Sequence, residues 1–228
     1  MLGQKNTVYV FHHIPKCGGT SLKMVLNKWF ITIKDYRIGW TGMNYPEKVD
    51  IGSLRSCHCL CGHFEFDGYY LHQRYPEVFM SDRYRVITFV RDPLQIKLSL
   101  FRYEKMHNQS VAETIEERLF MLPNYLSKRF PATLDNYRDV IDRYYFVGIL
   151  EEKEISLNVL ASMMGKPFEP LPWLNKSYDN ASGNENSEYV SQEVLTRFKE
   201  ENLLDYQVYA YCREKFKRLC SCEAERSI

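Results

Sequence analysis

The sequence has no hydrophobic run approaching the length of about 18 residues that a membrane-spanning helix needs. Its opening segment, MLGQKNTVYVF, is too short and too polar for a secretory signal peptide. It also has almost no net charge, since 30 Lys and Arg oppose 29 Asp and Glu. This balance excludes bulk attraction to nucleic acid, so any anion site must come from a local cluster. We therefore expect a cytoplasmic protein with neither a membrane segment nor a nucleic-acid partner.

Cysteine is present as an odd number, seven, so the thiols cannot all pair within the chain. Reduced thiols in a cytoplasm are the simpler interpretation. Cys57, Cys59 and Cys61 alternate along a segment that can form a strand, which would place them on one face. Zinc sites favour CxxC or HxxxH spacing instead. We expect core packing and no metal, and a zinc-binding module remains the alternative.

The 228 residues are 45% hydrophobic and 14% aromatic, enough to bury the core of one α/β domain spanning 1–228. No repeat or break in composition marks a second domain. β-Branched and aromatic runs predict strands at 7–13, 85–90 and 144–150, with another at 58–66 that runs into a loop. Helical spacing or capping signals predict helices at 20–30, 92–102, 156–165 and 191–218, with shorter ones at 69–79 and within 110–143. Residues 31–56 follow no clear period, and 166–190 read as a long loop. Alternating strands and helices predict a mainly parallel central sheet flanked by helices in three layers.

The first candidate site is the loop KCGGTS between a predicted strand and a predicted helix. Backbone N–H groups and the dipole at a helix N-terminus favour an anion, and paired glycines let a phosphate approach. Two hydroxyls and a mobile ammonium add further donors. The predicted phosphate-binding residues are Lys16, Cys17, Gly18, Gly19, Thr20 and Ser21. The nucleotide-triphosphatase pattern differs, because it places its Lys directly before Ser or Thr. The structural alternative is an ordinary Gly-rich turn.

The second candidate site follows the predicted strand at 85–90. Arg91 comes directly after it, and Ser99 lies about two helical turns further on. Asp92 and Pro93 supply an N-cap and a first helical residue. An Arg at the carboxyl end of a strand faces the crevice where α/β proteins bind ligands, and its guanidinium can grip a terminal phosphate. The alternative is a surface ion pair with Asp92.

These motifs together resemble a known family. IPKCGGTSL, residues 14–22, is similar to the 5′-phosphosulfate loop of sulfotransferases that use 3′-phosphoadenosine 5′-phosphosulfate (PAPS). It looks most like the heparan and chondroitin uronosyl 2-O-sulfotransferases and their bacterial relatives. RDPLQIKLSLF resembles the family's 3′-phosphate motif RDPxxRxxSxY, with Ile96 at the position of the second Arg. The resemblance implies a P-loop-like fold, PAPS as co-substrate and 3′,5′-adenosine bisphosphate (PAP) as product. It implies that Arg91 and Ser99 hold the 3′-phosphate.

The resemblance also implies the proton-transfer group. GHFEF at 62–66 resembles the family's Gly-His motif, so His63 is the expected catalytic base and Lys16 the group that stabilises the leaving phosphate. In the uronosyl enzymes this motif is HGH, and Cys61 stands here in place of the first His. The resemblance to that branch therefore supports the nucleotide donor more than it supports a uronic-acid acceptor. LNKSYDN resembles a loop that closes over the nucleotide, so Lys176 and Ser177 are further candidates. Glu65 is a second possible base. Packing is the favoured role of the two histidines that end the first strand, His12 and His13, and the alternative is that one of them lines the pocket.

The expected reaction is in-line transfer of a sulfuryl group from PAPS to a hydroxyl, or an amine, of a carbohydrate or small-molecule acceptor. A nucleotide-binding module without transfer is an alternative. A nucleotide kinase would need a Lys before Ser or Thr and a carboxylate for magnesium, which these motifs do not supply. A glycan acceptor would need a basic groove near the nucleotide. The candidates for that groove are Arg83, Arg85, Lys97, Arg102 and Lys105.

Overall fold

The computed structural model describes residues 6–37, 45–64, 70–170 and 190–226. Within these residues a five-stranded sheet has the order β2-β3-β1-β4-β5, and all four pairings are parallel. The strands are β1 (Val8–His12), β2 (Ile31–Asp35), β3 (His58–Gly62), β4 (Tyr84–Val90) and β5 (Phe146–Ile149). Apolar runs such as VYVFH and FVGI are buried on both faces, as parallel sheets require. The predicted parallel α/β architecture is confirmed.

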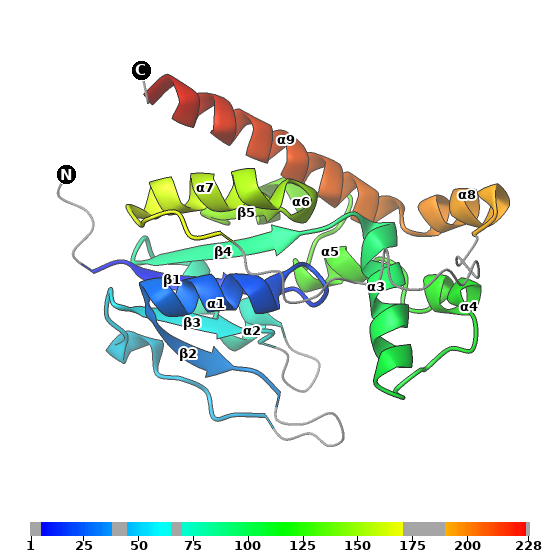
Figure 1. Ribbon diagram of the computed structural model, residues 1–228. Helices are drawn as coiled ribbons and strands as arrows, with labels where there is room; N and C mark the ends of the chain where they lie inside the picture. The colour runs from blue at the N-terminus through cyan, green and yellow to red at the C-terminus, as the bar shows by residue number, and fades with distance from the viewer. Residues whose placement is uncertain (1–5, 38–44, 65–69, 171–189, 227–228) are drawn as a thin grey trace.

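Helices flank this sheet. The longer ones are α1 (Gly19–Trp29), α3 (Pro93–Met106), α7 (Lys153–Met164), α8 (Gln192–Glu201) and α9 (Leu203–Arg226). Shorter ones are α2 (Leu71–Arg74), α4 (Ile115–Phe120), α5 (Tyr125–Arg129) and α6 (Tyr137–Asp142), with 3₁₀ turns η1 (Ile51–Ser53), η2 (Pro76–Phe79) and η3 (Leu150–Glu152). α7 and α9 both pack on β5 (Figure 1). Among the described residues, no helix combines the length and apolarity that crossing a membrane requires.

Two elements differ from the sequence predictions. β2 lies in the segment that showed no clear period, because it is an edge strand whose first residue, Ile31, is 59% exposed. The helix predicted from 191 to 218 is two helices separated at Asn202. The buried Asn202 side chain donates to Phe198 O at 2.9 Å and accepts from Asn124 N at 2.9 Å. A polar side chain bonded in this way ends one helix and fixes the next against α5.

The register of the sheet decides which residues meet at its carboxyl edge. His12 pairs with Gly62 and Asp35 pairs with the same Gly62, so three strands end level with one another. The first residues beyond those ends are His13, Tyr36 and His63. β4 extends further, since Thr88 pairs with His12, and Arg91 follows its last residue. Carboxyl ends of parallel strands form the crevice where α/β folds bind ligands.

Candidate active site

The KCGGTS segment forms a tight turn from β1 into α1. Lys16 and Gly18 both have left-handed backbone angles, with φ of 68° and 78°, and Gly18 is the N-cap of α1. A lysine in this region is uncommon, so the surrounding contacts hold the backbone there. Cys17 between them is 1% exposed, and burial raises the pKa of its thiol to about 12. Cys17 therefore anchors the loop as a neutral core residue and offers a ligand only its backbone.

The start of α1 has the features of an anion site. Its N-cap residue, Gly18, has no side chain with which to cap the first N–H groups. The first turn contains no acidic residue, Thr20 is exposed and Ser21 is partly exposed. α1 spans 11 residues, so its dipole reaches full strength at this end. Phosphate binding by this loop stays a prediction.

Gly19 is needed for close packing at the first residue of α1. A Cβ placed there would lie 1.9 Å from Cδ2 of the His13 ring and 2.0 Å from its Nε2. No side chain fits that space, so α1 can begin directly against the ring that follows β1. This contact joins the phosphate loop physically to the histidines at the sheet edge.

Arg91 lies next to the phosphate loop. Its Nη1 donates to Lys16 O at 3.5 Å, a long hydrogen bond that leaves most of the guanidinium's donors for other partners. In the described residues Arg91 has no ion pair with Asp92, which instead caps α3 by accepting from Gln95 N at 3.1 Å. The predicted N-cap is therefore confirmed, and the surface ion pair is not observed.

The Lys16 ammonium lies over α3. Its Nζ is 3.9 Å from the centre of the Tyr103 ring, a cation–π contact. Tyr103 is one helical turn beyond Ser99, so both residues lie on the same side of α3. Burial lowers the pKa of Lys16 to about 8, and Arg91 contributes to that shift. Lys16, Arg91 and the Ser99 side of α3 thus lie around one region.

His63 lies beside two other aromatic side chains at the sheet edge. Its ring centre is 4.5 Å from that of His13 and 4.9 Å from that of Tyr36. The Nε2 of His63 is buried and has no hydrogen-bond partner among the described residues. Burial, then Arg129 and Lys23, lowers its pKa to about 4. His63 is therefore neutral near pH 7, with a buried ring nitrogen whose missing hydrogen bond costs about 1–3 kcal/mol.

The backbone around His63 is tightly constrained. A Cβ on Gly62 would lie 2.1 Å from the backbone oxygen of Asp35, so glycine lets β3 approach the end of β2. Phe64, directly after His63, has φ of 56° and is fully buried. A non-glycine residue in this region turns the chain sharply. In the Gly-His motif, His63 therefore follows the carboxyl end of β3, while its neighbours Gly62 and Phe64 are packed against other parts of the chain.

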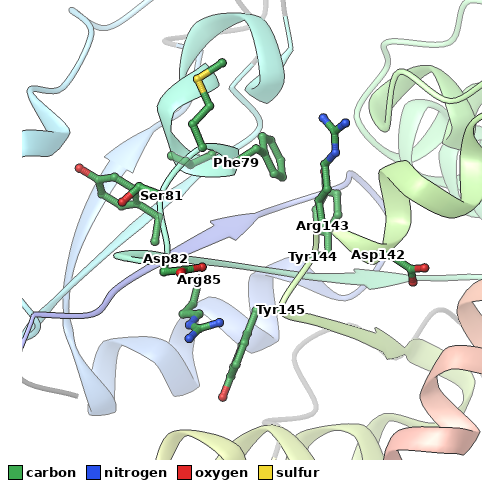
Figure 2. A pocket seen from close by; sticks show the side chains of 11 residues that line it. Phe79, Ser81, Asp82, Arg85, Asp142, Arg143, Tyr144 and Tyr145 are labelled. Atoms are coloured by element: carbon green, nitrogen blue, oxygen red, sulfur yellow. The ribbon is translucent and has the colours of Figure 1, made fainter. Parts of the chain in front are cut away.

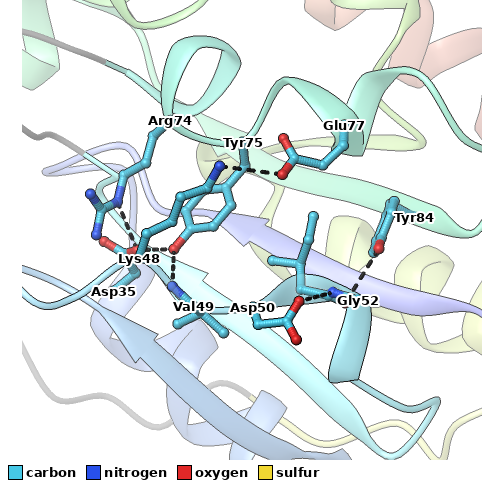
Figure 3. Close-up of polar contacts among 10 residues, drawn as sticks. Asp35, Lys48, Val49, Asp50, Gly52, Arg74, Tyr75, Glu77 and Tyr84 are labelled. Atoms are coloured by element: carbon cyan, nitrogen blue, oxygen red, sulfur yellow. Dashed lines mark hydrogen bonds and ion pairs between the residues drawn. The ribbon is translucent and has the colours of Figure 1, made fainter.

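A buried ion pair holds the end of β2 (Figure 3). Asp35 is 2% exposed and accepts from Arg74 Nε at 2.9 Å and from the Tyr75 hydroxyl at 2.5 Å. Arg74 also donates to Pro46 O at 2.8 Å. These contacts fix the residue directly before Tyr36, so they set where the Tyr36 ring lies relative to His63.

The packing prediction is confirmed for both of the strand-ending histidines. His12 is 1% exposed, bonds through Nδ1 to the Tyr144 hydroxyl at 2.9 Å, and burial lowers its pKa to about 3. His13 is packed too, stacked on Phe11, but its other side contacts His63. Side chains alternate across a strand, which explains why adjacent histidines face different surroundings.

Sequence analysis missed Tyr36 and Tyr103 as site residues. Tyr36 follows the one strand that was not assigned, although the apolar alternation of ITIKD was a usable signal. Tyr103 stands four residues after Ser99, the helical spacing of neighbours on one face. Three other candidates, Lys176, Ser177 and Glu65, lie outside the described residues.

Three of the five candidates for a basic groove lie away from the candidate site. Lys97 is 1% exposed, and its ammonium donates to Met121 O and, at 2.9 Å, to Leu122 O, so it stabilises the chain between α4 and α5. Arg83 donates to Leu54 O at 2.6 Å at the amino edge of the sheet. Arg85 stands six residues before Arg91 on one strand, about 20 Å away. These three cations therefore belong to the core and to the opposite edge, whereas Arg102 and Lys105 are exposed on α3.

Two cavities lie at that opposite, amino edge. One, of about 340 Å³, is lined by residues including Tyr84, Arg85 and Tyr145 (Figure 2). The other, of about 440 Å³, lies between Lys48 and Tyr84. Both are separated from His63 and Arg91 by the length of the strands, so neither is part of the candidate active site.

The cysteine cluster does not gather ligands at one point. Cys59 and Cys61 are fully buried in the core with their sulfurs 3.7 Å apart, whereas Cys57 is exposed at the start of β3. Cys57 and Cys61 are four strand residues apart, about 13 Å, too far for one zinc ion. The described residues contain no group of three side chains suited to a metal. Core packing explains the two buried cysteines.

Comparison with known proteins identifies the fold. No protein-family model matches the chain, and no curated protein sequence does. Among solved structures, a sulfotransferase from Alicyclobacillus acidocaldarius aligns over 93% of this chain and 96% of its own, with a TM-score of 0.51 and 12% identity. The mouse sulfotransferase SULT7A1, complexed with PAP, aligns over 92% and 89%, with a TM-score of 0.59 and 14% identity. The likeness establishes a P-loop-like α/β fold over nearly the whole chain. Neither structure is described as a uronosyl 2-O-sulfotransferase, so that branch stays a prediction.

Proposed function

We propose that this protein is a PAPS-dependent sulfotransferase, a single domain over 1–228 that acts on a carbohydrate or small-molecule acceptor. The observation that carries the proposal is the convergence at one sheet edge of a phosphate-type loop, Arg91 and a neutral histidine with an unpartnered nitrogen. The fold shared with two sulfotransferases, one of them complexed with PAP, supports it. With seven cysteines free in the described chain, we place the protein in the cytoplasm.

The residues fit a nucleotide with phosphates at both ends. The N-terminus of α1 offers backbone donors to the 5′ end, and Lys16 adds a cation there. The Arg91 guanidinium makes one long hydrogen bond within the described part of the chain, so it has donors for a 3′-phosphate, and Ser99 adds a hydroxyl. A nucleotide that binds at both the 5′ and the 3′ site binds more tightly than one without a 3′-phosphate, so the protein discriminates PAPS from other adenine nucleotides. PAPS supplies an activated sulfuryl group when it is bound.

His63 is the proposed base. A hydroxyl bound against Nε2 would satisfy the one polar atom that the described structure leaves buried without a partner on this ring. The acceptor O–H bond breaks as the proton moves to Nε2, the acceptor oxygen bonds to sulfur, and the sulfur–phosphate oxygen bond breaks. Lys16 faces the charge left on the phosphate oxygen. A bound anionic nucleotide also favours protonated His63, since opposite charge raises a histidine pKa.

An acceptor screen tests the proposal. The purified protein is incubated with PAPS and separate panels of sugars, phenols and amines, and mass spectrometry detects addition of a sulfuryl group. His63→Ala should abolish product while PAP still binds with wild-type affinity, because the base contributes to proton transfer and not to the phosphate sites. Full turnover in this variant would move the base to another residue. Binding of PAP without any product from the wild type across all panels would favour a nucleotide-binding module.

A further inference from the structure

Three aromatic side chains meet where β2, β3 and β1 end level with one another. Tyr36, His63 and His13 are the first residues beyond these strands. The His13 Nδ1 and the Tyr36 hydroxyl are hydrogen-bonded at 3.1 Å, and the His63 ring lies against both partners. We propose that Tyr36 and His13 are positioning residues that clamp the His63 ring in its orientation. The inference rests on the proposed function for the role of His63, but the clamp is a property of the free protein.

Both arms of the clamp are held by the fold. The Tyr36 arm follows Asp35, whose buried carboxylate is bonded to Arg74 and to the Tyr75 hydroxyl. The His13 arm is wedged against Gly19 at the start of α1, where a single Cβ would collide with the ring. Each arm is therefore fixed independently, and the 3.1 Å hydrogen bond joins them across the end of β3.

His63 depends on these two rings for its orientation. In the part of the chain that the structure describes, its side chain forms no hydrogen bond, and its ring contacts are to His13 and Tyr36. Both contacts are edge-to-face, with interplanar angles of 63° and 78°, a favourable arrangement for aromatic rings. A general base must present one nitrogen to the proton that it removes, so freedom of this ring would lower the rate of proton transfer.

The groups that face His63 also determine the charge around its ring. They come from four elements: His12 and His13 at the end of β1, Tyr36 after β2, Lys23 on α1 and Arg129 on α5. Burial keeps Tyr36 a neutral phenol by raising its pKa, and it holds the pKa of His13 well below 6.5. The clamp thus stays uncharged.

The variant Tyr36→Phe tests the clamp, because it keeps the ring and removes the hydroxyl. The titration of His63 is followed by NMR through its Cε1–H signal, assigned by comparison with His63→Ala. We expect the midpoint to rise from about 4 toward 6.5, because a loosened ring gains water and loses the desolvation that lowers its pKa. We expect kcat to fall by about three- to tenfold, the effect of losing one neutral hydrogen bond, with PAP affinity unchanged.

Tyr84→Phe is the matched control, since the Tyr84 hydroxyl makes one hydrogen bond, 3.3 Å to Ile51 O, at the opposite edge of the sheet. It should leave the His63 titration at its wild-type midpoint. His13→Asn is the second variant, and it carries the test if Tyr36→Phe does not fold. It removes the ring that contacts His63, so the midpoint should rise again. The double variant should shift no further than the larger single shift, because the two residues act as one unit.

An unchanged His63 midpoint in both single variants would overturn the clamp, whatever the activity. If the wild type makes product while the His63 midpoint is unchanged in both variants, the proposed function stands and only the clamp is rejected. If the wild type makes no product, the proposed function fails, but a raised midpoint in both variants still supports the clamp. A fall in PAP affinity in Tyr36→Phe equal to its fall in kcat would also contradict a positioning role, because it would place Tyr36 in the nucleotide site.

Discussion

Arg91 is the residue on which discrimination between nucleotides should depend. Replacing it with alanine removes a guanidinium whose one hydrogen bond to the described residues is long, 3.5 Å to Lys16 O, so little structure is lost with it. A hydrogen bond to a charged group contributes about 1.5–3 kcal/mol. Because 1.4 kcal/mol is a factor of ten, Arg91→Ala should weaken PAP binding by about tenfold to a hundredfold. 5′-AMP, which has no 3′-phosphate, should bind the variant as it binds the wild type.

Isothermal titration calorimetry with PAP and 5′-AMP measures this difference. The wild type should prefer PAP by at least about tenfold, and the variant should lose most of that preference. Arg85→Ala is the matched control, because it removes the same charge from the other end of β4, where the guanidinium packs on Tyr145. It should leave both affinities unchanged. Equal weakening of PAP and 5′-AMP in Arg91→Ala would refute a 3′-phosphate role and would assign Arg91 to support of the phosphate loop. Equal affinities of the wild type for PAP and 5′-AMP would contradict a site that binds both the 5′ end and the 3′-phosphate.

Two further perturbations test the phosphate loop. Gly19→Ala forces a methyl group toward the His13 ring at 1.9 Å, so the free energy of unfolding should fall by about 1–3 kcal/mol, measured by urea denaturation. Gly165→Ala is a contrasting control, because that glycine has a positive φ and nothing within 4 Å, so its loss comes from backbone strain, whereas Gly19 has no positive φ and its loss comes from the collision. The pKa of Lys16 is lowered to about 8, so its ammonium is lost as the pH rises above that value, and PAP affinity should fall between pH 7 and 9.5. In Lys16→Arg the charge persists and the fall should be much smaller; an identical pH profile would show that another group titrates.

Much of the fold could be predicted because its elements are locally encoded. The buried strands β1, β4 and β5 are continuous apolar runs, and α3 begins at Asp92 and Pro93 as capping preferences predict. β2 was not assigned, since half-exposed edge residues such as Ile31 weaken the pattern of a strand and leave only the short alternation of ITIKD as a signal. The break between α8 and α9 also escaped prediction. It depends on Asn124, which is 78 residues distant from Asn202 and bonds to its side chain.

The candidate site could be predicted in part. Lys16, Arg91 and His63 were predicted because each lies beside a turn or at a strand end, and a short sequence motif is enough to recognise such a position. The structure brings Lys16 and Arg91 together through a 3.5 Å hydrogen bond. Predictions that depend on which distant segments pack together were less successful. Tyr36 and Tyr103 were not predicted, and Lys97 was wrongly offered as a groove residue. Lys97 reads as a surface cation beside Ile96, but it is buried against the carbonyl groups of another segment.

The sequence by itself determined a parallel α/β protein with a phosphate-type loop, an arginine after a central strand and a histidine after another. Each of these depends on neighbours a few residues away, where backbone geometry and hydrogen bonding are local. Only the tertiary structure decided that His13, Tyr36 and His63 form one cluster, because parallel pairing brings strand ends together regardless of the distance between them in the chain. The same register placed Arg83 and Arg85 at the opposite edge and brought His13, which precedes the phosphate-type loop, against the ring of His63.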